Sequence, residues 1–124
     1  MTPDTARRLA KAERFLTQSN GQSPDEAPEA TIHLAYYAML HAAAAVLMER
    51  TGRVPKSHGA IIGQFSHAVA QQDEAGRALS RAFNRAEDER LAADYDDAVV
   101  PTARSASEMR ELAQAFVTYC RALL

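Results

Sequence analysis

The sequence predicts an all-α protein: a single domain, residues 1–124, built as an antiparallel up-and-down bundle of four long helices and one short helix. Apolar residues recur at spacings of three and four along most of the chain, and no stretch shows the strict alternation of a strand. Glycine and proline are few, five of each, and they cluster at breaks between the periodic segments. Hydrophobic residues make up 47% and charged residues 24% of the chain, which is typical of a globular domain with one core.

The first helix is expected over residues 3–18, because Thr2 can cap it and a proline at its first position suits a helix start. The polar segment 19–27 contains glycine and proline and is predicted to be a flexible loop, so that residues 1–29 form an N-terminal helix and its connection. The second helix carries the strongest apolar stripe and is expected over residues 28–50, with Gly52 as its C-terminal stop.

The remaining helices are predicted from the same signals. A short third helix is expected to begin near Ser57, which can cap it. The fourth is expected over residues 73–93 and is followed by a loop over residues 94–104 that contains a proline. The last helix is expected to begin at Ser105 or Ser107 and to run to the end of the chain. Short connections between neighbours favour an up-and-down arrangement, with the third helix as an appendage.

Charge and cysteine content limit the functional classes. The net charge of −2 gives no general attraction to nucleic acid or to an acidic membrane, so such binding would need a local patch. The one cysteine, Cys120, cannot form an internal disulfide, which favours a cytoplasmic protein. We expect no apolar run of the roughly 18 residues that a membrane span needs. Residues 1–12 lack the apolar segment of a signal peptide, so no membrane association is expected.

Arg90 is the most informative charged residue. Helical residues advance by about 100° each, and on that wheel Arg90 falls within the apolar arc that contains Phe83 and Ala86. A guanidinium that faces the interior is costly unless it is paired. One explanation is that Asp94, one turn later, pairs with Arg90, or that the apolar face of the helix is already exposed to solvent at this position. The other is that Arg90 lines a cleft or a dimer seam and binds an anion such as phosphate.

The four histidines give no metal motif. They are His33, His41, His58 and His67. No two of them are four residues apart, so we expect no metal and no other cofactor. His41 lies beside the main stripe of the second helix, and His58 opens the third helix on its apolar face. For each of these two, a partly buried structural role and a ligand-binding role both stay open.

Other reactive or charged groups are less informative. Arg77, Arg81 and Arg85 share one stripe of the fourth helix, which is either a solvated face or a contact for RNA phosphates. Cys120 lies on the core stripe of the last helix, where a buried, inert thiol is expected. The sequence has no Ser, His and Asp set that suggests a nucleophile, and no glycine-rich phosphate loop.

Two segments resemble a known family. The first is AYYAMLHAA at residues 35–43, followed by VPKSHG at residues 54–59, and the second is RLAADYD at residues 90–96. In this order and spacing they resemble the HEPN superfamily (higher eukaryotes and prokaryotes nucleotide-binding) over about residues 30–120, and in particular its small single-domain bacterial and archaeal members. The resemblance implies four or five helices and a homodimer. It also implies a role as an RNase or toxin, or as the partner of a minimal nucleotidyltransferase.

The RNase members of that superfamily carry an arginine followed, after four to six residues, by a histidine, and two copies meet across the dimer to form a composite site. Arg90 matches the arginine of this motif. Residues 91–97 contain no histidine, and Tyr95 stands where it would be. Tyrosine, with an unperturbed pKa of about 10, is a poor base at neutral pH. Arg90 could still hold a phosphate, because anion binding needs only its charge and its donors.

We therefore expect a homodimeric protein that binds a nucleotide or RNA phosphate, or that partners a separate nucleotidyltransferase in a toxin–antitoxin-like pair, rather than an enzyme. The expected ligand-binding residues are Arg90, Asp94, Tyr95, Tyr37, His41 and His58. One alternative is a helical dimerisation or scaffold module without a ligand. The other is a metal-independent RNase with a degenerate site, in which Tyr95, His41 or His58 replaces the missing base. That alternative requires an imidazole within hydrogen-bond reach of Arg90.

Overall fold

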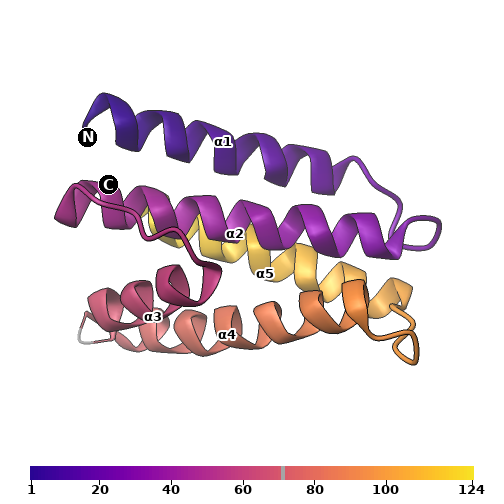
Figure 1. Cartoon of the computed structure of the whole chain (residues 1–124). Coiled ribbons are helices and arrows are strands. Elements are labelled where there is room, and N and C mark those ends of the chain that lie inside the picture. Colours follow the sequence, from indigo (N-terminus) through magenta and orange to yellow (C-terminus); the bar gives the residue numbers. More distant parts are fainter. Residues whose placement is uncertain (71) are drawn as a thin grey trace.

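The computed structural model describes residues 1–70 and 72–124 and shows five α-helices, with no strand among these residues (Figure 1). The helices are α1 (Pro3–Asn20), α2 (Pro28–Thr51), α3 (His58–Val69), α4 (Glu74–Tyr95) and α5 (Ala103–Ala122). Figure 1 shows the four long helices, α1, α2, α4 and α5, running alternately in opposite directions. The short α3 packs against α2 and α4. The predicted all-α class, with four long helices and one short one, is confirmed.

Several predicted helix ends are confirmed by their hydrogen bonds. The Thr2 hydroxyl accepts from the backbone N–H of Thr5 at 3.1 Å and caps α1. The Ser57 hydroxyl caps α3 in the same way, by accepting from the N–H of Ala60 at 3.1 Å. Gly52 ends α2 with a φ of 74°, a left-handed conformation that only glycine adopts at little cost.

Three helix boundaries differ from the prediction. α1 continues through Asn20, because the buried Ser19 hydroxyl donates to the Thr31 carbonyl of α2 at 3.0 Å and ties down this turn. α4 continues through Tyr95 instead of ending at residue 93, because the Asp94 carboxylate accepts from an arginine one turn earlier.

α5 begins at Ala103, before either of the two serines that the sequence offers as its start. Thr102 is the N-cap. Its hydroxyl accepts from the N–H of Ser105 at 3.0 Å, and the Ser105 hydroxyl accepts from the N–H of Thr102 at 3.0 Å. This reciprocal pair is a capping box with serine in the position that glutamate usually occupies.

α2 is the central helix and contacts each of the other four. Its buried residues lie all around its circumference, and Ala42 to Ala45 are small enough to let neighbouring helices approach closely. Three aromatic rings from α3, α4 and α5 pack together in the core, with ring centroids 4.8–6.0 Å apart. They are Phe65, Phe83 and Phe116. The core therefore runs through the middle of the bundle, with α2 as its axis.

The apolar character of α2 corrects one expectation. From the sequence we expect no apolar run long enough to span a membrane. By length and composition, however, α2 is the one helix among the described residues that could cross a membrane. However, 72% of its most apolar window is buried against the other helices. A helix that is apolar on all sides is what the centre of a helical bundle requires.

Candidate functional site

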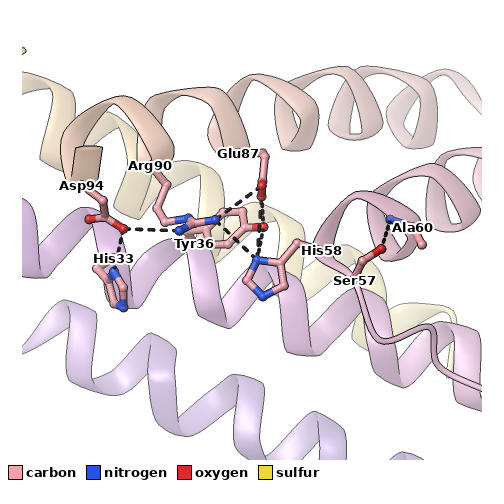
Figure 2. Close-up of polar contacts among 8 residues, drawn as sticks. All are labelled: His33, Tyr36, Ser57, His58, Ala60, Glu87, Arg90 and Asp94. Carbon is pink, nitrogen blue, oxygen red and sulfur yellow. Dashed lines mark hydrogen bonds and ion pairs between the residues drawn. The ribbon is translucent and has the colours of Figure 1, made fainter. Parts of the chain in front are cut away.

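Arg90 lies on the inward face of α4, and only 6% of its surface is exposed. Side chains from three helices converge on its guanidinium (Figure 2). α2 contributes Tyr36, α3 contributes His58, and α4 itself contributes Glu87 and Asp94. We call these five residues the Arg90 cluster. The helical wheel correctly placed Arg90 on the apolar face.

The guanidinium is held by two carboxylates. Its Nη2 donates to Glu87 Oε1 at 3.4 Å, and its Nη1 donates to Asp94 Oδ2 at 3.3 Å. Burial opposes the charge of Arg90, but the Asp94 hydrogen bond and the Glu87 carboxylate outweigh it, and the pKa of Arg90 is raised. The pairing with Asp94 is the first of the two explanations that the sequence left open. Arg90 Nε is buried without a hydrogen-bond partner among the described residues.

Tyr36 forms the floor of the cluster. Its ring is completely buried and lies under the guanidinium, 4.8 Å from Arg90 Cζ to the ring centroid, which is a cation–π contact. Its hydroxyl donates to Glu87 Oε2. Burial, followed by the hydrogen bond and the charge of Glu87, raises the pKa of Tyr36 well above its ordinary value. Tyr36 is therefore a fixed hydrogen-bond donor, and it does not act as a base.

His58 is the first residue of α3, and its side chain is 31% exposed, so it forms the edge of the cluster. Its Nδ1 lies 3.4 Å from Arg90 Nη2 and 3.3 Å from the Tyr36 hydroxyl. A guanidinium can only donate, so the Arg90 contact needs an accepting Nδ1, whereas the Tyr36 hydroxyl gives its one proton to Glu87 and can only accept from a protonated Nδ1. Nε2 lies on the side of the ring away from Glu87 and Arg90 (Figure 2). His58 thus presents Nε2 to the outside, as an N–H donor when Nδ1 accepts from Arg90 and as a lone pair when Nδ1 donates to Tyr36.

The charge balance of the cluster limits what it can bind. One guanidinium faces two carboxylates, which leaves one net negative charge when the imidazoles are neutral. His33 adds a second imidazole, with Nδ1 at 3.7 Å from Asp94 Oδ2 and a side chain that is 46% exposed. An anion would therefore meet the imidazoles at the rim of the cluster, and not Arg90 itself.

Tyr37 connects the cluster to the neighbouring surface. Its ring centroid lies 5.6 Å from that of His58 and 4.7 Å from that of His33. It also lies 6.3 Å from the ring of His41, one helical turn further along α2. His41 stacks on Phe15 of α1 at 5.3 Å and belongs to a separate groove. Burial, and then the nearby charges of α1, lower the pKa of His41 to about 4.

The structure does not bring Tyr95 to the cluster. Five helical residues separate it from Arg90, which turns it by about 140° around α4, and 77% of its surface is exposed. The structure does bring together Arg90, Asp94 and His58, with Tyr37 beside them. Arg90, Asp94 and His58 do not line any of five cavities of the described residues, although Glu89 and Ala93, near Arg90 in the sequence, line one of them. Among the described residues, no group of three or more His, Cys, Asp or Glu side chains could hold a metal ion.

Sequence reasoning missed three members of this region. Tyr36 lies among the apolar residues of α2, and nothing local distinguishes it from a core aromatic residue. Glu87 precedes Arg90 by three residues, a spacing that places both on one helix face, and this signal was available. His33 was treated only as one of four histidines, although its ring lies beside Asp94.

The comparison with known proteins agrees with this architecture. The sequence model of the HEPN domain matches residues 5–123, which is nearly the whole chain and includes most of α1. The match thus extends beyond residues 30–120, over which the resemblance was seen. No curated protein matches the sequence. Because the domain match covers almost the full length of the all-helical chain, the protein belongs to the HEPN family.

Proposed function

We propose that this HEPN-domain protein binds the phosphate group of a nucleotide or of RNA at the rim of the Arg90 cluster, with His58 as the principal contact. The observation that carries the proposal is the orientation of the His58 ring. Its inner nitrogen lies 3.4 Å from Nη2 of the buried Arg90, and in the tautomer in which it accepts from this guanidinium the outer nitrogen is an N–H donor. A preorganised donor at a partly exposed edge suits a phosphate oxygen.

Arg90 is a positioning residue in this proposal. Its guanidinium is 7% exposed and is already engaged by two carboxylates, so a ligand would not reach it without breaking those ion pairs. Its contribution is to hold the His58 ring in one orientation. Tyr37 and His33 flank that ring and add aromatic surface and a second imidazole at the rim.

The proposal extends to the partners of the protein. The family resemblance implies a homodimer and a separate small nucleotidyltransferase in a toxin–antitoxin-like pair. Exposed apolar side chains at the end of α4 and in the following loop support contact with another chain, because such groups rarely cluster on a monomer surface. They are Leu91, Tyr95, Val99 and Val100. Molar mass measured by light scattering tests the dimer.

A metal-independent RNase is the second candidate. His58 lies within hydrogen-bond reach of Arg90, which is the geometry that this alternative requires. When Nδ1 accepts from Arg90, Nε2 carries the proton and His58 can only donate to a ligand; when Nδ1 donates to the Tyr36 hydroxyl, Nε2 has a free lone pair. A base that takes a proton from a ribose hydroxyl needs a free lone pair facing the substrate, so catalysis requires the second tautomer.

One set of variants distinguishes phosphate binding from RNA cleavage. We would measure the Kd for uridine 5′-monophosphate by titration calorimetry for the wild type, His58→Ala and the control His67→Ala, which removes an exposed imidazole from the same helix. Loss of a charge-assisted hydrogen bond should weaken binding by His58→Ala about tenfold or more. Equal Kd values for all three proteins would refute the proposal. RNA cleavage by the wild type and His67→Ala but not by His58→Ala would establish the RNase instead.

A further inference from the structure

A groove of about 450 Å³ lies between α1 and α2, next to the Arg90 cluster but separate from it. Its charged and polar lining residues come almost entirely from one face of α1. They are Asp4, Arg7, Arg8, Lys11, Arg14 and His41. Four cations and one carboxylate thus line a single groove in a chain whose net charge is −2. The positive charge is a local property of this surface.

Most of these cations are not used by the fold. Arg7 forms an ion pair with Asp4. Arg8, Lys11 and Arg14 form no ion pair with any residue that the structure describes. Three adjacent cations repel one another, so they favour an anion that would separate them. The groove is therefore available to a ligand with several negative charges.

Aromatic rings continue from the groove to the Arg90 cluster. Phe15 and His41 stack with their ring planes only 7° apart, and Tyr37 lies 5.9 Å from Phe15. Tyr37 in turn contacts His58 at 5.6 Å between ring centroids. A row of cations beside partly exposed aromatic rings is the combination that binds single-stranded nucleic acid, in which the cations contact phosphates and the rings stack on bases.

We infer that the α1–α2 groove binds the sugar–phosphate backbone of a single-stranded RNA and leads that strand toward His58. The inference rests on the proposed function for the end of the path, but the groove is a distinct site with its own residues. A membrane surface fits less well, because a helix that lies on lipid exposes an apolar face. In α1, Leu9, Ala12 and Leu16 are buried against the bundle, and Phe15 packs partly buried against the core.

His41 provides an internal reporter of occupancy. Burial, Lys11 and Arg8 of α1, and His58 of α3 together lower its pKa to about 4, and the rings of Phe15 and Tyr37 complete its surroundings. A phosphate between Lys11 and Arg8 would cancel part of their effect. The pKa of His41 should therefore rise when RNA occupies the groove, and it should stay unchanged if RNA binds elsewhere.

The test uses a fluorescein-labelled twelve-residue oligouridylate and fluorescence anisotropy over a range of salt concentrations. The α1 variant combines Arg8→Gln, Lys11→Gln and Arg14→Gln. The matched control removes three arginines from α4 by combining Arg77→Gln, Arg81→Gln and Arg85→Gln. Both variants lose the same charge, and circular dichroism verifies that both remain folded.

We expect the α1 variant to bind the oligonucleotide at least tenfold more weakly. The slope of log K against log salt should fall by about two, since each phosphate contact with a single strand contributes about 0.7. The control should stay within about twofold of the wild type. In addition, NMR titration of the His41 ring should show a higher pKa with the oligonucleotide bound.

Equal weakening by both variants would overturn the inference, because binding would then follow only total charge. Unchanged binding by the α1 variant, or stronger binding of the wild type to anionic phosphatidylserine vesicles than to RNA, would also overturn it. Failure of the proposed function is distinguishable. If His58→Ala binds uridine 5′-monophosphate and the oligonucleotide as the wild type does while the α1 variant fails, the groove stands and the His58 site falls.

Discussion

Replacing Arg90 with methionine should destabilise the fold by about 3 kcal/mol. Methionine keeps the apolar stem, so the change removes charge without leaving a large cavity. At separations of 3.3 and 3.4 Å and an effective dielectric constant of about 20, each ion pair has a gross Coulomb energy of about 5 kcal/mol. Most of it offsets desolvation, and breaking a buried pair typically costs about 3–5 kcal/mol. The partial exposure of Asp94, at 28%, places Arg90 at the lower end.

Urea unfolding followed by circular dichroism at 222 nm measures this loss, and a double-mutant cycle with Glu87→Gln assigns it. Glu87 is the less exposed of the two carboxylate partners, so its coupling to Arg90 should be about 1–2 kcal/mol. An Arg90→Met protein within about 0.5 kcal/mol of the wild type, or a cycle with no coupling, would show that the buried ion pairs do not hold α4 in place.

This prediction also determines how the site should be studied. A loss of about 3 kcal/mol is a large share of the 5–15 kcal/mol that stabilises a typical domain. Loss of binding by an Arg90 variant could therefore result from unfolding alone. His58 lies at the edge of the cluster and is 31% exposed, so its variants separate binding from stability.

Three further predictions concern the rest of the bundle. The pKa of His41 is lowered to about 4 in the folded protein, below its ordinary value of about 6.5, so the unfolded chain takes up the proton first as the pH falls. The free energy of unfolding of the wild type should be unaffected by His41 above about pH 6.5 and should fall by at most about 3 kcal/mol toward pH 4. Urea titrations of His41→Gln should lack that part of the decline. Identical pH profiles of stability for the variant and the wild type would contradict this account. Gly76→Ala would place Cβ 2.5 Å from the Tyr119 hydroxyl and 2.9 Å from the Val69 carbonyl oxygen. This overcrowding should cost about 1–3 kcal/mol of stability and lower the melting temperature of the variant. In the control Gly63→Ala the added Cβ meets nothing within 4 Å, so this change should be neutral or stabilising. Cys120 is completely buried, and burial raises the pKa of its thiol. A thiol reagent such as 5,5′-dithiobis(2-nitrobenzoate) should therefore react with Cys120 only as urea unfolds the protein. Rapid stoichiometric labelling without urea would show that the buried face of α5 is accessible in the folded protein.

The fold was predictable because its signals are local. Helical periodicity, the Thr2 and Ser57 caps and the glycine stop of α2 each involve residues within one turn of each other. The start of α5 was missed because Ser105 resembles an N-cap when read alone. In the structure Ser105 is the third residue of the helix and the second partner of a capping box, and its role depends on Thr102.

The site was predictable only in part. The position of Arg90 on the inner face of α4 follows from helical geometry, whereas its pairing with Asp94 was only one of the explanations that the sequence left open. The position of His58 beside Arg90 could not be derived from spacing, because 32 residues and a change of helix separate the two. The sequence offered His58 only as one of three replacements for the missing base of the RNase alternative. Tyr95 stands where the family motif has its histidine, but helical rotation carries it into solvent.

The central position of α2 has a consequence for how the chain is made. Residues 30–48 contain no Asp, Glu, Lys or Arg, and their partners α3, α4 and α5 are all encoded downstream. During synthesis, which proceeds at about 5–20 residues per second, α1 is the only neighbour already available to cover this segment. The surface that α5 finally covers stays open until the last helix has emerged from the ribosome. The nascent chain therefore exposes part of its most apolar long helix to water during this interval.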